Sequence, residues 1–325
     1  MQTRQLGYSD LQLTVVGLGT WAIGGGGWIY GWGPQDDADS IAAIQRALDL
    51  GINWIDTAAV YGAGHSEEVV SRAIAGRRHE VIVATKGGRI LEPGQEQPFA
   101  RLKADSLRRE VEASLRRLRV EAIDLYQIHW PDPDEDIEEG WGAVAELIRE
   151  GKVRYGGVSN FSVAQLKRIQ PIHPVVSLQP PYSMLRRGIE DELLDYCTAN
   201  NIGVIAYSPM QAGLLTGKFS RERLATRPDD DWRPRNEHFQ EPQLSLNLEL
   251  VEKLRPMAAR HGRNVAQLAI AWVLRRPEIT AAIVGARHPA QIEETAPAGD
   301  WQLSAAELAE IDNLLAWREQ RLQES

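Results

Sequence analysis

Ile52-Asn53-Trp54-Ile55-Asp56-Thr57-Ala58-Ala59-Val60-Tyr61 is a short apolar run that ends on a carboxylate and reaches a tyrosine five residues later. The run is too short for a typical helix and follows Leu50-Gly51, a helix stop, so it predicts a buried strand. We expect the end of this strand to deliver Asp56 into a loop, with Tyr61 beside it.

Two later apolar runs end in the same way. The run over 81–85 is followed by Lys86, and the run over 123–128 is followed by His129. In a parallel barrel the carboxyl ends of the strands share one face, where such folds place their chemistry. The sequence therefore predicts that a carboxylate, an ammonium, an imidazole and a phenol meet at one end of the fold.

Strand and helix patterns alternate along the rest of the chain. The expected strands cover 15–19, 52–56, 81–85, 123–128, 153–158, 175–178, 203–207 and 281–284, and helical patterns follow them. Continuous apolar strands separated by helices are typical of a parallel sheet covered on its outside, and eight such units close a barrel. We predict an α/β protein with a (β/α)8 TIM barrel as a single domain over 1–325. A hairpin over 6–13 would cap one end, and a final helix over 304–320 would lie outside the repeat.

Composition excludes several classes of function. A formal net charge of −9 argues against nucleic-acid and anionic-membrane surfaces, which need concentrated positive charge. No segment approaches the roughly 18 uninterrupted apolar residues of a membrane span, and the N-terminus lacks the apolar core of a signal peptide. Cys197, the one cysteine, fits a buried thiol better than a nucleophile. A cytoplasmic protein is the expectation.

The four polar groups suit proton transfer to an oxygen. A phenol is a weak acid with an ordinary pKa of about 10, and an ammonium beside it favours the phenolate. Lys86 can play that part for Tyr61, while Asp56 holds the ammonium charged. His129 could donate a hydrogen bond to a substrate oxygen or carry a second proton. A carbonyl that receives hydride is one such oxygen, although each residue alone also has an ordinary structural explanation.

At these residues the chain resembles the aldo-keto reductase superfamily, specifically its bacterial, potassium-channel β-subunit-like branch, over nearly its whole length. The matching stretches are Asn53-Trp54-Ile55-Asp56-Thr57-Ala58-x-x-Tyr61-Gly62, Ala84-Thr85-Lys86, Asp124-Leu125-Tyr126-Gln127-Ile128-His129-Trp130-Pro131, Gly156-Gly157-Val158-Ser159-Asn160-Phe161, Gln179-x-x-Tyr182-Ser183, Ala206-Tyr207-Ser208-Pro209-Met210 and Ile283-Val284-Gly285-Ala286-Arg287. The resemblance implies an NADP(H)-dependent carbonyl reductase with Asp56, Tyr61, Lys86 and His129 as its catalytic tetrad, and Tyr61 as the general acid.

The resemblance also implies where the coenzyme binds. Ser159, Asn160 and Gln179 would hold the nicotinamide carboxamide, and the ring of Tyr207 would stack on the nicotinamide. The other expected cofactor contacts near the mouth and the pyrophosphate are Thr20, Trp21, Asp56, Ser208, Pro209, Met210, Gly213, Leu215, Gly217 and Lys218. A glycine motif at Gly17-Leu18-Gly19 also fits a Rossmann fingerprint, but no helix opens after it.

The choice of coenzyme depends on the stretch after the last strand. Its expected contacts are Gly285, Ala286, Arg287, Gln291 and Glu294. Much of the superfamily has a lysine-serine pair where this chain has Gly285 and Ala286, and an arginine where it has Gln291. By resemblance to the bacterial branch, Arg287 meets the 2′-phosphate of NADP(H), to which a guanidinium is suited.

The substrate is a small-molecule carbonyl compound whose identity the sequence leaves open. Trp28, Tyr30, Trp32 and Trp130, with Trp232 as a further candidate, suggest an aromatic wall over the pocket. A self-packed surface loop is the alternative for the first three. Two other functions compete: a cofactor-binding regulatory subunit of a potassium channel, and a metal-dependent hydrolase, for which clustered ligands are lacking. We expect no metal, and the oligomeric state stays open.

Overall fold

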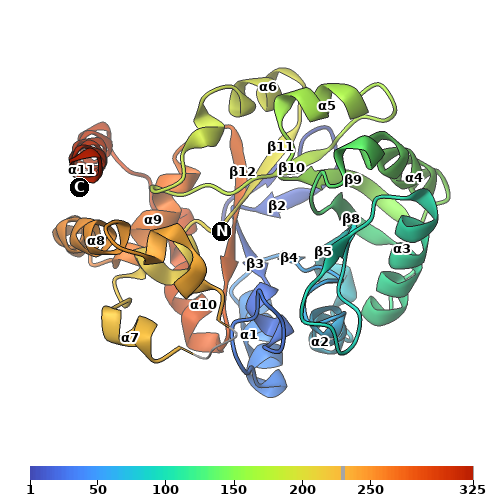
Figure 1. Ribbon diagram of the computed structural model, residues 1–325, viewed down its shortest axis with the longest axis horizontal. Helices are drawn as coiled ribbons and strands as arrows, with labels where there is room; N and C mark the ends of the chain where they lie inside the picture. The colour runs from blue at the N-terminus through green and yellow to red at the C-terminus, as the bar shows by residue number, and fades with distance from the viewer. Residues whose placement is uncertain (228–230, 325) are drawn as a thin grey trace.

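Eight parallel strands form a closed barrel in the computed structural model, which describes residues 1–227 and 231–324 (Figure 1). The strands are β3 Val16–Gly19, β4 Trp54–Asp56, β5 Ile82–Gly87, β8 Ile123–Ile128, β9 Val153–Ser159, β10 Ser177–Gln179, β11 Gly203–Tyr207 and β12 Ile279–Gly285. Each strand pairs with the next in chain order, and β12 pairs with β3 to close the ring. The predicted TIM barrel is confirmed.

Helices surround the barrel on its outside (Figure 1). They are α1 Asp37–Asp49, α2 His65–Ala73, α3 Ala104–Leu118, α4 Ile137–Arg149, α5 Val163–Ile169, α6 Leu193–Ala199, α9 Val265–Leu274 and α10 Pro289–Thr295. Local sequence fixes several starts. Ser162 and Gln165 form a capping box at α5, and Asn264 and Gln267 form another at α9, so backbone N–H groups of the first turn are satisfied.

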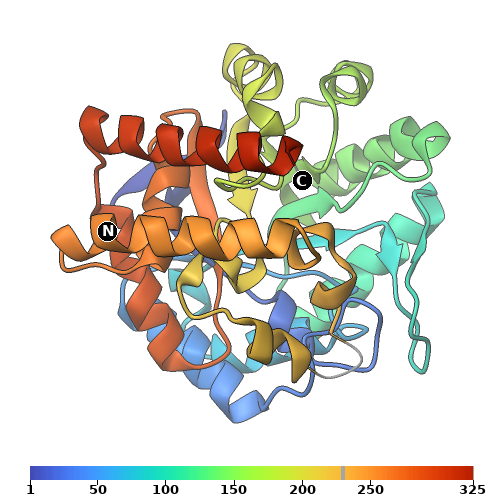
Figure 2. The same cartoon turned by 60° about the vertical axis from the view of Figure 1, so that its left-hand side comes forward.

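Some elements differ from the expectation. The final helix, α11 Ala305–Gln323, packs along α8 Gln243–Arg260, so α8 lies outside the repeat as well (Figure 2). Arg318 Nε donates to Asn247 Oδ1 across this pair at 2.6 Å. The sequence also missed the hairpin of β6 Arg89–Ile90 and β7 Phe99–Ala100 and the short helix α7 Arg221–Ala225. These pieces are too short for a hydrophobic period to develop.

The N-terminal hairpin closes the end of the barrel where the strands begin. Its strands are β1 Thr3–Gln5 and β2 Gln12–Thr14. Leu6, Leu11 and Leu13 are buried in one cluster with barrel-interior side chains that include Trp54 and Leu125. This end is filled by apolar side chains, so the strand ends opposite remain for polar groups.

Gly17 on β3 makes room for the largest of these interior side chains. A Cβ at Gly17 would lie 2.0 Å from the indole of Trp54. The indole is fully buried, and its Nε1 donates to the Thr14 carbonyl at 2.8 Å, so the ring is held in place and cannot move aside. A residue larger than glycine at position 17 is therefore expected to disturb the interior.

Gly17→Ala should lower the free energy of unfolding by about 1–3 kcal/mol, the usual cost of overpacking a dense core. Urea denaturation followed by circular dichroism measures it. Gly142→Ala on α4 is the matched control, because a Cβ there meets no atom within 4 Å. The control should keep or slightly raise stability, since alanine favours helix. Equal losses in both variants would contradict the packing argument.

Candidate active site

The structure brings Asp56, Lys86, His129 and Tyr61 together at the carboxyl ends of three adjacent strands. Asp56 is the last residue of β4, and His129 directly follows β8. β5 continues to Gly87, beyond the expected 81–85, so Lys86 lies inside it. β5 pairs with both β4 and β8, which makes the three side chains neighbours. Tyr61 lies in the turn after β4.

Lys86 uses all three of its N–H donors inside the protein. Its Nζ lies 2.6 Å from Asp56 Oδ2 and 2.9 Å from the Thr57 carbonyl oxygen. The third partner is Tyr61 Oη at 3.2 Å. An ammonium has three donors and no acceptor. Tyr61 Oη therefore accepts from Lys86, and its own proton is free to point to another group.

Asp56 is held by a second set of donors. Its Oδ1 accepts from Gln179 Nε2 at 2.8 Å and from Gln127 Nε2 at 3.4 Å. The sequence patterns do not single out Gln127 as a site residue. A signal is present: side chains alternate along a strand, so Gln127 points to the same side of β8 as Leu125, and to the same side as His129, which follows the strand.

Burial sets the charge state of the site. It raises the pKa of Tyr61; Lys86 opposes this shift, but the net direction is upward, so the phenol is protonated near neutral pH. The expected preference for phenolate is thus outweighed. Burial lowers the pKa of Lys86, but Asp56 and Tyr61 raise it, with a net upward shift.

His129 is held neutral. Burial, with the positive charges of Lys86 and Arg89, places the pKa of its imidazole well below the ordinary value. The ring lies edge-on to Tyr61, with centroids 5.8 Å apart. Nδ1 is buried and has no hydrogen-bond partner among the described residues. Of the two roles expected from sequence, a neutral hydrogen-bond donor fits this environment and a proton carrier does not.

The residues expected at the nicotinamide form one network beside the tetrad. Tyr207 Oη donates to Asn160 Oδ1 at 2.9 Å, and Asn160 Nδ2 donates to Ser159 Oγ at 3.0 Å. Ser159 Oγ donates to the Gln179 carbonyl oxygen at 2.8 Å. Asn160 has φ +65°, a conformation that asparagine tolerates better than most residues.

A second group of expected cofactor residues lies between the loop after β11 and helix α10. Lys218 Nζ is 2.5 Å from Glu294 Oε2, and Gln291 Oε1 accepts from the Arg287 backbone N–H at 2.7 Å. The loop after β11 also contains the expected residues Ser208, Pro209, Met210, Gly213, Leu215 and Gly217. Gly285 is the last residue of β12, and Ala286 is the residue after it. Gly213 has φ +96° with open space beyond its Cα, so its backbone is accessible to a ligand.

Arg287 reaches across to the loop after β3. Its guanidinium donates to Gln35 Oε1 at 2.5 Å and to the carbonyl oxygens of Trp32 and Pro34. Gln35 Nε2 returns a bond to the Arg287 carbonyl at 2.8 Å. The arginine thus ties the two loops together.

Thr20 lies in the buried interior, whereas Trp21 lies over Tyr61. Thr20 is buried, and its Oγ1 donates to the Asp56 carbonyl at 3.1 Å. Trp21 lies over Tyr61, with ring centroids 6.5 Å apart, and stacks on Trp232 at 5.2 Å. Trp32 packs edge-on to Trp21 at 5.3 Å. These indoles form an aromatic wall beside the Tyr61 ring.

The other expected pocket aromatics are spread out. Trp28 is buried in a cluster with Val60, Tyr61 and Leu91. Tyr30 is 46% exposed and contacts Trp28, and Trp130 is 40% exposed. Of the four residues, Trp28 and Trp32 are therefore the ones packed in the aromatic surroundings of the tetrad.

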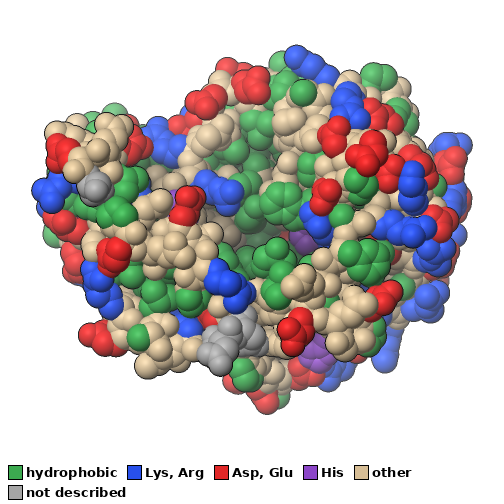
Figure 3. Space-filling model, in the orientation of Figure 1, with side chains coloured by type: hydrophobic (Ala, Val, Ile, Leu, Met, Phe, Trp, Pro, Cys, Tyr) green, Lys and Arg blue, Asp and Glu red, His purple; other side chains and the backbone are tan. Residues whose placement is uncertain are grey.

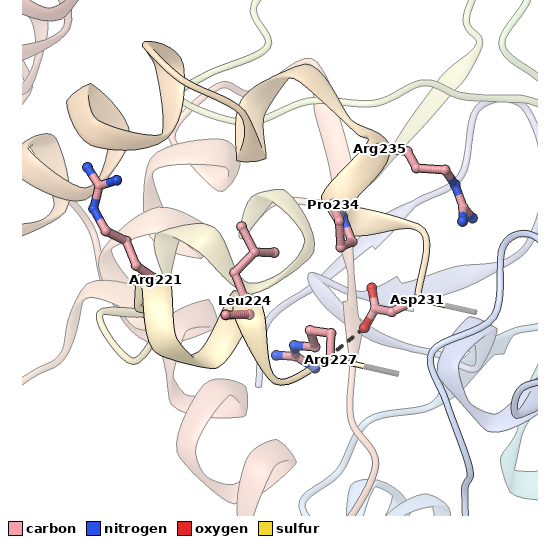
Figure 4. Close-up of a pocket in the computed structure, with 7 residues that line it drawn as sticks. Arg221, Leu224, Arg227, Asp231, Pro234 and Arg235 are labelled. Carbon is pink, nitrogen blue, oxygen red and sulfur yellow. Dashed lines mark ion pairs between the residues drawn. The ribbon is translucent and has the colours of Figure 1, made fainter. Parts of the chain in front are cut away.

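One face of the molecule is hollowed near its middle, where hydrophobic side chains gather (Figure 3). A cavity of about 470 Å³ lies in the segment after β11, where Arg227 pairs with Asp231 (Figure 4). Its lining consists of Arg221, Leu224, Ala225, Arg227, Asp231, Pro234 and Arg235. A second cavity of similar volume is lined from 24–28, 62–68 and 91–95. Neither cavity is lined by a tetrad side chain.

Residues 1–227 and 231–324 contain no group of three or more His, Cys, Asp or Glu side chains suited to a metal ion. Within these ranges no helix has the length and apolar character needed to cross a membrane. Pro228, Asp229 and Asp230 lie outside the described residues.

Comparison with known proteins shows which family the chain belongs to. The model of the Aldo/keto reductase family matches residues 15–316. The chain belongs to this family. It is 39% identical over 318 residues to aldo-keto reductase YhdN of Bacillus subtilis (strain 168), covering 97% of this chain and 94% of that protein. It is 35% identical to the NADH-specific methylglyoxal reductase of Escherichia coli (strain K12), covering 94% of this chain and 96% of that protein.

Solved structures of family members share the fold over almost the whole chain. Glycerol dehydrogenase AKR11B4 from Gluconobacter oxydans superposes with a TM-score of 0.88 at 40% identity, covering 98% of this chain and 96% of that one. The holo form of aldo-keto reductase AKR11C1 from Bacillus halodurans gives 0.80 at 29% identity, covering 97% and 96%.

Lys86→Met should destabilise the fold by about 3–5 kcal/mol, because it leaves the Asp56 carboxylate buried without its cation. The double variant Asp56→Asn/Lys86→Met should recover much of this loss, since no buried charge remains. Urea denaturation of both variants and the wild type measures the difference. Equal destabilisation of the single and double variants would show that the ion pair is not the cause.

Proposed function

We propose that this protein reduces aldehydes or ketones to alcohols with a nicotinamide coenzyme, and that Tyr61 is the general acid. The proposal is supported most directly by the hydrogen-bond count at Lys86. Its three donors are used by Asp56, Thr57 and Tyr61, so the tyrosine accepts from the lysine and keeps its own proton for a substrate oxygen.

The coenzyme, when bound, supplies the hydride that reaches the carbonyl carbon. The chain's own groups then act on the carbonyl oxygen. Tyr61 transfers its proton to this oxygen as negative charge develops, and Lys86 stabilises the phenolate that remains. Neutral His129 donates a hydrogen bond that orients the oxygen, and Asp56 keeps Lys86 in place. The reverse sequence oxidises an alcohol, with Tyr61 as base.

The residues near the tetrad fit a nicotinamide. Gln179 has an amide oxygen to which no described residue donates, and Ser159 and Asn160 lie beside it. Tyr207 offers a ring for stacking, and the glycine-rich backbone at 213–217 with Lys218 offers amides and a cation for the pyrophosphate. Gln291 and Glu294 are the candidates for the adenosine.

We propose NADP(H) as the preferred coenzyme. Arg287 already holds three acceptor oxygens from the loop after β3, and a 2′-phosphate presents the same kind of acceptor with more charge. The relatives include a protein named for NADH specificity, so the two coenzymes need to be compared directly.

The substrate pocket lies beside the indoles of Trp21, Trp32 and Trp232. The names of two relatives, a methylglyoxal reductase and a glycerol dehydrogenase, direct the first assays to short oxo-aldehydes, hydroxyketones and polyols. We assign the whole chain, 1–325, to one catalytic domain that acts in the cytoplasm.

Tyr61→Phe should lower turnover of aldehydes and ketones by at least 10²-fold, roughly the contribution of a general acid, because only the transferable proton is lost. Consumption of reduced coenzyme, followed by absorbance, measures turnover, and quenching of tryptophan fluorescence checks that coenzyme still binds. Full activity of the variant would overturn the assignment of the acid. Coenzyme binding without turnover in the wild type would instead favour a regulatory role.

Arg287→Ala should weaken NADPH binding by at least about tenfold while changing NADH binding less, since charge-assisted bonds to phosphate are the strong ones. Dissociation constants from fluorescence titration give the two values. Arg149→Ala, at an exposed arginine far along the chain, is the control and should change neither. Equal weakening of both coenzymes would place the 2′-phosphate elsewhere.

A further inference from the structure

Gln127 is a buried amide in the barrel interior to which the proposed reaction assigns no part. It lies on β8 opposite Lys86 of β5 in the strand register. Its Nε2 is 3.4 Å from Asp56 Oδ1, and its Oε1 accepts from Gln179 Nε2 at 3.3 Å. With the 2.8 Å bond from Gln179 to Asp56, the three side chains form a closed triangle.

The backbone beside Gln127 leaves space for this arrangement. Gly157 is its partner on β9, and a Cβ there would lie 3.3 Å from Gln127 Cγ and 2.3 Å from Ser177 Oγ. A side chain at position 157 would crowd both neighbours. Glycine at position 157 therefore leaves the room that the stem of Gln127 and the hydroxyl of Ser177 occupy.

The charge of Asp56 fixes the orientation of both amides. A carboxylate only accepts hydrogen bonds, so Gln127 and Gln179 must each turn their NH₂ group to Oδ1. Gln179 Nε2 carries two protons. One is donated to Asp56 and the other to Gln127 Oε1. Gln179 Oε1 is then left as an acceptor, and no described residue donates to it.

We propose that Gln127 is a positioning residue: by accepting the second N–H of Gln179, it holds Gln179 Oε1 toward the barrel mouth as an acceptor for the carboxamide N–H of the nicotinamide. This inference rests on the proposed function, because it takes the coenzyme to bind at Gln179. Without Gln127, the second N–H of Gln179 loses its acceptor and the amide can rotate.

The site should therefore select a ligand that donates an N–H to Gln179 Oε1. An acetyl group in place of the carboxamide has an oxygen and a methyl group but no N–H, so it offers Gln179 Oε1 no hydrogen bond. The same triangle connects the proposed nicotinamide-binding residue Gln179 to Asp56, and Asp56 in turn contacts Lys86, which contacts Tyr61. Gln127 thus acts through Gln179 and Asp56 and does not touch the reacting atoms.

The test compares the dissociation constants of NADP⁺ and its 3-acetylpyridine analogue, measured by tryptophan fluorescence quenching. The wild type should bind NADP⁺ about tenfold more tightly than the analogue, which is the usual effect of losing one hydrogen bond without replacement. Gln127→Met should reduce this preference to about twofold or less, because the acceptor of Gln179 is no longer oriented. The ratio of the two dissociation constants depends only on the folded protein that binds. A loss of stability would therefore not change this ratio.

Two further variants sharpen the test. Gln127→Asn keeps an amide but is too short to reach both partners, so it should also reduce the preference for NADP⁺ over the acetylpyridine analogue. It replaces Gln127→Met in the test if that variant fails to fold. Gln320→Met, on the exposed side of α11, should leave the ratio at the wild-type value.

The outcomes separate the two proposals. An unchanged preference in Gln127→Met or Gln127→Asn, or equal binding of both compounds by the wild type, overturns the role of Gln127 while leaving the reductase proposal intact. A wild-type protein that binds neither compound overturns both.

Discussion

A buried ammonium must satisfy every N–H it carries, and at Lys86 this requirement shapes the site. The residue is 1% exposed, and its three partners come from the end of β4 and the turn that follows. Loss of any partner would leave a desolvated donor, which costs more than an ordinary hydrogen bond contributes. Because the phenol is the third acceptor, its proton is directed away from the lysine, and the acid needed for carbonyl reduction follows from this constraint.

The rest of the site extends from the same contact. Asp56 balances the ammonium and is itself held by two amides, so the network reaches from β4 to β10 across the barrel. Low dielectric strengthens these bonds and also keeps Tyr61 protonated and His129 neutral. At the opposite end, the Leu6, Leu11 and Leu13 side chains fill the interior, so the carboxyl ends of the strands are the open ends. The barrel thus separates its stabilising core from its polar site.

Sequence reasoning reached the barrel and the meeting of the tetrad because both follow from local patterns. Apolar runs fix the strands, and parallel strands bring the residues at their ends to one face. It missed Gln127: alternation along β8 places this side chain inside the barrel, but a single polar residue in an apolar strand does not show which residues it will contact. It also could not foresee that Arg287 holds Trp32 and Pro34, some 250 positions apart in the chain. The net pKa direction of Tyr61 depends on burial, which only the packed structure gives. The pairing of α8 with α11 likewise depends on long-range packing.

The pH dependence of turnover in both directions tests the central claim that Tyr61 gives and takes the proton. Carbonyl reduction needs the protonated phenol and should fall as pH rises through its pKa, while alcohol oxidation needs the phenolate and should rise over the same range. The two profiles should therefore be opposite. Profiles that change in the same direction, or reduction that is independent of pH up to the limit of protein stability, would contradict it.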